Sequence, residues 1–304
     1  ETELSALGQE KYEDAEAKKA AFAEKWTELI ASGKLGYMAL LRNLRNILEA
    51  DVDDNTIKDV AERIGDAQEV LKSKQFPFRF LSAYRELKTV CNGKVPIIMD
   101  SLEDAVQASA QNIKGFSKET RVLLACDVSG SMYTPISPKS SVKNYDIGLV
   151  LAMLLRNRCE NVVTGIFGDT WKAVAMPLRG ILSNVEQMYK REGEVGYSTN
   201  GYKVIEYLRN KSIQMDKVMM FTDCQMWNSY GSGQTIQSEW KKYKEIAPKA
   251  KLYLFDLNGY GQSPLNLADN DVVLIAGWSD RVFDMLDAIE QGGNVLAKIK
   301  EIEL

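Results

Sequence analysis

The residues best suited to chemistry lie in the segment Asp127-Val-Ser129-Gly130-Ser131, which follows a short apolar run. The spacing places one carboxylate and two hydroxyls at alternate positions, and Gly130 lets the chain turn tightly enough for all three to face one centre. Hard divalent cations such as Mg²⁺ prefer oxygen ligands and keep several waters, so this donor set suits Mg²⁺. The remaining ligands must come from elsewhere in the chain.

Two later segments supply further oxygen donors. Asp223 follows the apolar run 218–221, and Thr199 lies in a polar turn ahead of a helical pattern. In an open α/β sheet, ligands collect beyond the carboxyl ends of the strands, where the strand order reverses. The sequence therefore predicts one metal shell made of Asp127, Ser129, Ser131, Thr199 and Asp223. The alternative is that Asp127 and Ser129 only cap a following turn.

The segments around these residues indicate a doubly wound α/β fold with a mostly parallel sheet. The run 122–126 is apolar at every position, which is typical of a strand covered by helices on both faces. Strands are predicted at 122–126, 161–167, 171–176, 218–221, 252–255 and 272–275, with Gly168-Asp169 as a hairpin turn. Helices are predicted at 145–158, 185–191, 200–210, 240–247 and 279–289, with a helical tail to residue 304 and a long loop at 133–143. Right-handed crossovers are expected between the parallel strands.

The first 118 residues contain helical patterns and no strand pattern. Helices are predicted at 10–32, 36–50, 54–71, 78–90 and 96–113. Helices of similar length in succession suggest an α-solenoid of the HEAT type, so we expect a helical segment at 1–118 and an α/β domain at 119–304.

An acidic stretch within this helical segment resembles a calcium-binding loop. Carboxylates and amides at positions 51, 53, 55, 59 and 62 nearly match the EF-hand spacing, but Thr56 stands where the tight turn needs Gly. The competing interpretation is the acidic N-terminus of a helix, with Asp54 or Asn55 as its cap.

Composition excludes several classes of function. The chain contains no histidine, which removes Ser-His-Asp and Cys-His catalysis, His-containing zinc sites and histidine pH switches. A net charge of -4 gives no global attraction to nucleic acid or to an anionic membrane, so any RNA binding must use a local patch.

The sequence shows no membrane-spanning run and no signal peptide. Four widely spaced cysteines indicate buried free thiols in a reducing compartment, so we expect a cytoplasmic protein. Residue 1 is Glu rather than Met, which is compatible with further sequence upstream.

Several stretches carry a resemblance to a known family. The segments 26–32, 36–46, 75–85 and 95–106 look like the last helical repeats of a TROVE module. The segment from Asp127 to Met132, with Thr199 and Asp223 downstream, resembles the metal-ion-dependent adhesion site of a von Willebrand factor A (vWA) domain. A TROVE module followed directly by such a domain resembles the Ro autoantigen family of ribonucleoproteins.

The resemblance implies RNA binding, since the family's ring of HEAT-like repeats holds small noncoding Y RNAs and the ends of misfolded RNAs in RNA quality control. This chain departs from the pattern because about five predicted helices precede the vWA domain, and a closed ring needs many more. Within the chain, the basic residues dense enough to suggest phosphate contacts are Lys34, Arg42, Arg45, Lys72, Lys74, Arg79, Arg85 and Lys88. The alternative is that these are solvated helix faces balanced by nearby acids.

Three functions follow from these patterns. In the first, a Ro-like RNA-binding protein uses Mg²⁺ or another divalent cation in its vWA domain to bind a protein partner, which offers an acidic side chain to the metal. In the second, the chain is a metal-dependent protein-binding module with no RNA role in this truncated form. In the third, the metal activates water for hydrolysis. The third lacks a general base beyond the metal ligands themselves, so the chain is predicted not to be an enzyme.

Overall fold

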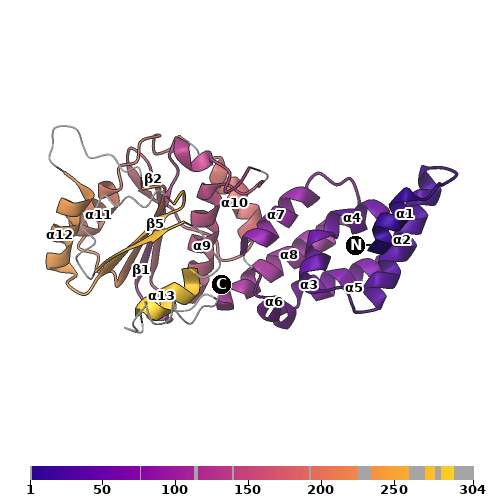
Figure 1. Ribbon diagram of the computed structural model, residues 1–304. Coiled ribbons are helices and arrows are strands. Elements are labelled where there is room, and N and C mark those ends of the chain that lie inside the picture. The colour runs from indigo at the N-terminus through magenta and orange to yellow at the C-terminus, as the bar shows by residue number, and fades with distance from the viewer. Residues whose placement is uncertain are drawn as a thin grey trace. The chain divides into compact units, whose positions relative to one another are not determined.

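The computed structural model describes residues 2–75, 77–112, 116–138, 140–191, 193–224, 234–259, 271–277 and 282–290. The chain divides into two compact units, residues 1–111 and 112–304. The first unit contains helices, and the second contains a sheet with helices against it (Figure 1).

The first unit is a set of short amphipathic helices that pack on one another. They are α1 (Thr2–Gln9), α2 (Ala15–Ala31), α3 (Tyr37–Arg42), α4 (Leu44–Ala50), α5 (Asp54–Gly65), α6 (Ala67–Ser73), α7 (Pro77–Leu87) and α8 (Val95–Ser109), followed by a 3₁₀ turn at Ala110–Asn112. Helix α8 packs against α5, α6 and α7, and α2 packs against α4 and α5. The apolar stripe of each helix supplies the core, as in Leu40, Ile47, Val60, Phe80 and Leu102, all of which are fully buried.

Two predicted helices are each broken into two. The helix expected at 36–50 is interrupted at Asn43, and the one expected at 54–71 is interrupted at Asp66. At the second break the side chain of Asp66 accepts the N–H of Glu69 at 2.7 Å, which caps α6. A side chain that can bond the backbone locally competes with helix continuation, and the apolar period alone does not report this.

The acidic stretch at 51–62 forms a helix start and not a calcium loop. Helix α5 begins at Asp54, within the stretch that an EF-hand loop would occupy. Asp53 is the cap, in place of the predicted Asp54 or Asn55, and its carboxylate accepts the N–H of Thr56 at 2.8 Å. Asp51 instead forms ion pairs with Lys94 and Lys19 at 3.1 and 3.4 Å.

The second unit is built on a six-stranded sheet with the order β3-β2-β1-β4-β5-β6. Its strands are β1 (Val122–Asp127), β2 (Val162–Phe167), β3 (Trp171–Ala173), β4 (Lys217–Thr222), β5 (Lys251–Asp256) and β6 (Val272–Ala276). All neighbours are parallel except β2 and β3, which form an antiparallel pair. The predicted doubly wound, mostly parallel α/β fold is therefore confirmed. The strand order reverses at β1, between β2 and β4.

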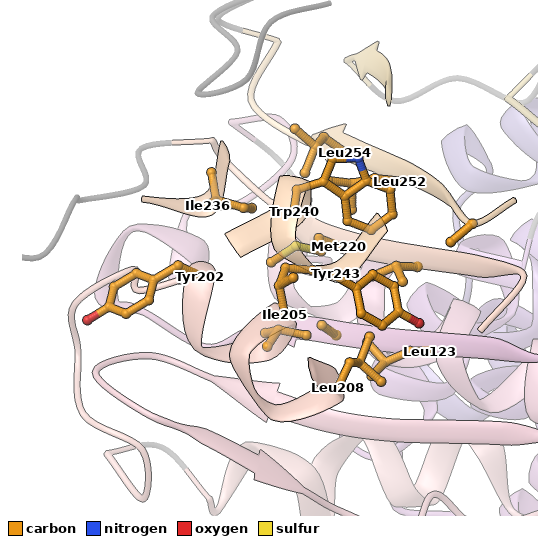
Figure 2. Close-up of a cluster of buried hydrophobic side chains, with 14 of the residues drawn as sticks. Leu123, Tyr202, Ile205, Leu208, Met220, Ile236, Trp240, Tyr243, Leu252 and Leu254 are labelled. Atoms are coloured by element: carbon orange, nitrogen blue, oxygen red, sulfur yellow. The ribbon is translucent and has the colours of Figure 1, made fainter. Parts of the chain in front are cut away.

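Helices cover both faces of this sheet, as they must where strands are apolar at every position (Figure 1). They are α9 (Asn144–Arg158), α10 (Ile181–Tyr189), α11 (Tyr202–Asn210), α12 (Ile236–Ile246) and α13 (Val282–Glu290). Helices α11 and α12 pack on each other, and their buried side chains meet Leu123, Met220 and Leu254 of the central strands (Figure 2).

Helix α9 covers the other face and approaches the sheet closely. It packs against β1, β2 and β4. A Cβ atom added to Gly148 of α9 would lie 2.8 Å from the Cβ of Phe221 in β4 and 3.5 Å from the Sγ of Cys126 in β1. Glycine at this position therefore lets the helix backbone lie against the two strands that end at the candidate site.

Candidate metal centre at the carboxyl edge of the sheet

Two carboxylates lie at the point where the strand order reverses. Asp127 is the last residue of β1, and Asp223 follows the last residue of β4 directly. Both side chains are fully buried, with 0% exposure. Because β1 and β4 are parallel neighbours, their carboxyl ends open at the same edge of the sheet.

The carboxylate of Asp127 is held by two hydrogen bonds. The backbone N–H of Ser129 donates to Oδ1 at 2.8 Å, and the hydroxyl of Thr222 donates to Oδ2 at 2.6 Å. Burial raises the pKa of Asp127 to about 7; these hydrogen bonds oppose the shift, and the charge of Asp223 adds to it. Burial disfavours the charged form of this carboxylate, and a bound cation would stabilise that form.

The two serines of the predicted shell lie side by side next to Asp127. The Oγ atoms of Ser129 and Ser131 are 3.3 Å apart. Ser129 is buried, and Ser131 is half-buried at the start of a 3₁₀ turn, Gly130–Tyr133. The turn therefore directs both hydroxyls to one place, as the alternate spacing predicts.

Thr199 lies buried in a loop that is fixed to the end of β2. The backbone N–H of Asn200 donates to the carbonyl of Gly168 at 2.9 Å, and the N–H of Ser198 donates to Oδ1 of Asp169 at 2.8 Å. The bond from Ser198 lowers the pKa of Asp169. Residue 167, at the end of β2, pairs with Asp127 in the sheet, so this loop leaves the same edge.

Two further residues of this edge were not predicted. Thr222 donates the hydrogen bond to Asp127, and Asp256 is a fully buried carboxylate at the end of β5. Burial raises the pKa of the neighbouring Cys224 thiol, and the charges of Asp256, Asp223 and Asp127 raise it further. The charges of these three carboxylates therefore act on one buried thiol. The available signal was the pattern of an apolar run that ends on Asp, which β5 shares with β1.

The chemistry of the donor set fits a hard cation. Among the residues that the structure describes, no three Asp, Glu, Cys or His side chains are grouped to hold a metal ion. The predicted shell combines two carboxylates with three hydroxyls, and such an all-oxygen set with few charges suits Mg²⁺ better than zinc or iron.

The basic residues predicted to contact phosphate lie on several elements of the helical unit. Lys34 lies between α2 and α3, while Arg42, Arg45, Arg79 and Arg85 lie on α3, α4 and α7, which contact one another. The first four are exposed and Arg85 is half-buried. Arg45 forms an ion pair with Glu49 at 2.8 Å. The packing brings the arginines onto neighbouring helices, and Arg45 is balanced by an acid, as the solvated-face alternative expects.

The two tyrosines on either side of Thr199 differ in exposure. Tyr197 is 58% exposed, whereas Tyr202 is buried at the start of α11. Trp227 and Trp278 lie outside the described residues, as does the helical tail expected at 290–304 beyond its first residue.

Comparison with known families agrees with this architecture. A family model described as the TROVE domain matches residues 8–125, and one described as the Ro60 vWA domain matches residues 121–289, more than half of the chain. The chain belongs to the Ro family of TROVE-domain proteins. The resemblance predicted from the sequence motifs is confirmed, with the two modules in the predicted order.

Individual relatives of this Ro-family chain are similar over different extents. The crystal structure of the Deinococcus radiodurans Ro (RSR) protein aligns with a TM-score of 0.64 and 19% identity, covering 95% of this chain and 66% of that one, which shows the shared fold. Telomerase protein component 1 of Rattus norvegicus is 45% identical over 65 residues, 21% of this chain and 2% of that protein. The Mus musculus protein of the same name is 45% identical over 62 residues, 20% of this chain and again 2% of the relative.

No helix within the described part of the chain is both long enough and apolar enough to span a membrane.

Proposed function

We propose that this chain is an RNA-binding component of a ribonucleoprotein, with small noncoding RNA as its ligand and RNA quality control as its role. The observation that carries the proposal is that the TROVE and Ro60 vWA models match consecutive parts of one chain. The Ro family binds RNA, and two relatives of a short segment are named as telomerase components. The small RNA is the ligand class that the family implies.

The vWA domain, in this proposal, binds Mg²⁺ through Asp127, Ser129, Ser131, Thr199 and Asp223. Support comes from the burial of both carboxylates and from the 3.3 Å separation of the serine hydroxyls. When bound, the metal would supply a Lewis-acidic position for an acidic side chain of a protein partner. The chain's own part is to hold the ligands: Thr222 orients Asp127, and Asp169 fixes the Thr199 loop through Ser198.

The proposed role is binding and not catalysis. The chain has no histidine, and the buried carboxylates at this edge are assigned to holding the metal. We also propose a cytoplasmic location, because all four cysteines are free thiols, three of them buried.

RNA binding is tested by fluorescence anisotropy with a structured small RNA that carries a single-stranded 3′ end. We expect saturable binding that weakens steeply between about 50 and 200 mM salt. Absence of binding at both salt concentrations would defeat the RNA proposal and leave the metal-dependent protein-binding module as the function of this chain.

Metal binding is tested separately, with the ion itself as the probe. Isothermal titration with Mg²⁺, and electron paramagnetic resonance with Mn²⁺, should detect one site in the wild-type protein and none in Asp127→Ala. The same variant should keep its RNA affinity, because the helical unit and the metal site are separate units of the chain. Equal Mn²⁺ binding by the two proteins would remove the metal from the proposal.

A further inference from the structure

A cavity of about 730 Å³ lies in the helical unit, where side chains of α1, α2 and α4 face one another. Helix α1 packs on α2, and α2 packs on α4 (Figure 1). The small side chains of Ala15 and Ala50 line the cavity and leave space between the helices. Its volume falls within the roughly 300–1,000 Å³ range of small-ligand sites, so the cavity can hold a group the size of a ring.

One wall of the cavity is apolar and aromatic. Phe22 and Trp26 of α2 line it together with Leu4 of α1. Residues four positions apart lie on the same face of a helix, so the two aromatic side chains follow one another along this wall. Trp26 is buried and Phe22 is half-buried. The phenyl ring of Phe22 is therefore the aromatic surface within reach of a ligand.

A second wall carries two amide side chains, those of Asn43 and Asn46. The Nδ2 atom of Asn43 donates to the carbonyl of Ala39 at 2.8 Å, and the Nδ2 atom of Asn46 donates to Oδ1 of Asn43 at 2.9 Å. An amide side chain has two N–H donors and one carbonyl acceptor. Asn46 therefore keeps one N–H, and its Oδ1 bonds no residue that the structure describes. A donor and an acceptor on one exposed amide are what bidentate recognition of a base edge requires.

The charges around the cavity are almost balanced within the fold. Lys19 pairs with Asp51 at 3.4 Å, and Glu49 pairs with Arg45 at 2.8 Å. Lys18 is exposed and forms no ion pair with a described acid. The lining thus offers an aromatic ring, an open amide and one unpaired cation. This set favours a neutral ring that has one anionic group beside it.

The open amide decides between an apolar side chain and a nucleobase as the occupant. An aliphatic side chain of a protein partner would cover Asn46 without bonding it, and a covered polar group without a partner costs free energy. A nucleobase brings a flat face for Phe22 and an edge with donors and acceptors for Asn46. Unpaired bases of RNA are recognised by this combination of stacking and edge hydrogen bonds.

We propose that this cavity holds one unpaired base of single-stranded RNA, with Phe22 stacking on the base and Asn46 bonding its edge. Lys18 lies where it can contact an adjoining phosphate. The inference rests on the proposed RNA-binding function and names a place for it on the helical unit. None of the basic residues predicted from the sequence to contact phosphate lines the cavity, so the base contact adds to theirs.

The test measures affinity by fluorescence anisotropy for two forms of a hairpin RNA with a single-stranded 3′ tail. One form has an ordinary tail, and in the other the tail nucleotides lack their bases. The wild-type chain should bind the ordinary tail at least about fivefold more tightly, the lower end of measured stacking contributions. Phe22→Leu keeps an apolar side chain and removes the ring, and Asn46→Ala removes the amide at an exposed helical position. Each should weaken binding of the ordinary tail by about fivefold and leave binding of the base-free tail unchanged.

A matched variant and a second probe locate the contact. Asn55→Ala removes an exposed amide from α5 that does not line the cavity, and it should bind both RNAs as the wild type does. A tail that carries 4-thiouridine should cross-link, under ultraviolet light, to the peptide containing Phe22 in the wild-type chain.

The outcomes separate the base site from the proposed function. Equal wild-type affinity for the two RNAs, or unchanged affinity of Phe22→Leu and Asn46→Ala for the ordinary tail, would overturn the base site and leave RNA binding intact. Absence of binding to either RNA by the wild type would overturn the proposed function and the base site together. If Phe22→Leu instead changes the oligomeric state in sedimentation at the assay concentration, the cavity holds a second copy of the chain and the inference is refuted.

Discussion

Replacing Asp127 by Asn should stabilise the metal-free vWA unit and abolish its response to Mg²⁺. Asp127 is fully buried, and burial raises its pKa to about 7. Asn keeps the size of the side chain and the acceptor for the N–H of Ser129. Its amide nitrogen cannot accept the hydroxyl of Thr222, so one hydrogen bond is weakened.

The magnitude follows from the difference in pKa between the folded and unfolded chain. A folded-state pKa of about 7 against an ordinary 3.8 is about 3 units, which is at most roughly 4 kcal/mol at neutral pH and above. Loss of the Thr222 hydrogen bond costs about 1 kcal/mol. The free energy of unfolding of the variant should therefore be about 2 to 3 kcal/mol larger than that of the metal-free wild type at pH 8.

The sign of the pH dependence is set by proton binding. Between about pH 3.8 and 7 the folded wild type holds a proton on Asp127 that the unfolded chain has released, so its stability falls as the pH rises through this window. Above pH 7 the loss is complete, and stability levels off. Since the chain contains no histidine, no imidazole titrates in the same range. The Asn variant should lack this slope.

Hydrogen exchange of the buried amides of β1 and β4 measures this stability without interference from the helical unit. Wild type and Asp127→Asn are compared at pH 5.5 and 8, each with EDTA and with Mg²⁺, after correction for intrinsic exchange rates. The exposed substitution Asp59→Asn is the control and should behave as wild type. The reasoning is refuted if metal-free wild type is equally stable at both pH values, or if the variant is the less stable protein in EDTA at pH 8.

Three further substitutions test other contacts of the vWA unit. Gly148→Ala should destabilise it by about 1 to 3 kcal/mol in urea unfolding, because the new methyl would lie 2.8 Å from the Cβ of Phe221; equal or higher stability would show that α9 can move away. Asp169→Ala should weaken Mg²⁺ binding several-fold in calorimetric titration with the fold retained, because it removes the acceptor for the N–H of Ser198; unchanged affinity would separate this loop from the site. Tyr243→Phe should cost about 1 to 3 kcal/mol in thermal unfolding, since the lost hydroxyl bonds one backbone N–H and one carbonyl, both at 2.9 Å; a neutral effect would mean that water replaces it.

The fold class followed from local pattern because buried parallel strands carry an unmistakable signal. The run 122–126 is apolar throughout and ends on Asp127, and similar runs recur with helical segments between them. Helix continuity did not follow in the same way. Asn43 and Asp66 divide helices that the apolar period predicts as single, since the period reports which face is buried and not where a polar side chain bonds the nearby backbone.

Which residues meet at the carboxyl edge of the sheet depends on the order of the strands. Asp127 and Asp223 are 96 positions apart and become neighbours because β4 lies directly beside β1. Thr222 and Asp256 were not predicted, because a polar residue that only ends a strand and one that contributes to a site look the same in the sequence. Their surroundings in the fold distinguish them.

By itself, the sequence determined which segments are apolar, which residue types could bind a hard cation, and to which family the two modules belong, because these depend on local spacing and residue chemistry. The tertiary structure decided the rest. It buried Asp127, which raises its pKa, placed Thr222 to donate a hydrogen bond to it, and set Asp127 and Asp223 at the same edge of the sheet. The physical reason is that burial, through-space charge and strand adjacency arise between residues distant along the chain, and only the packed fold brings them together.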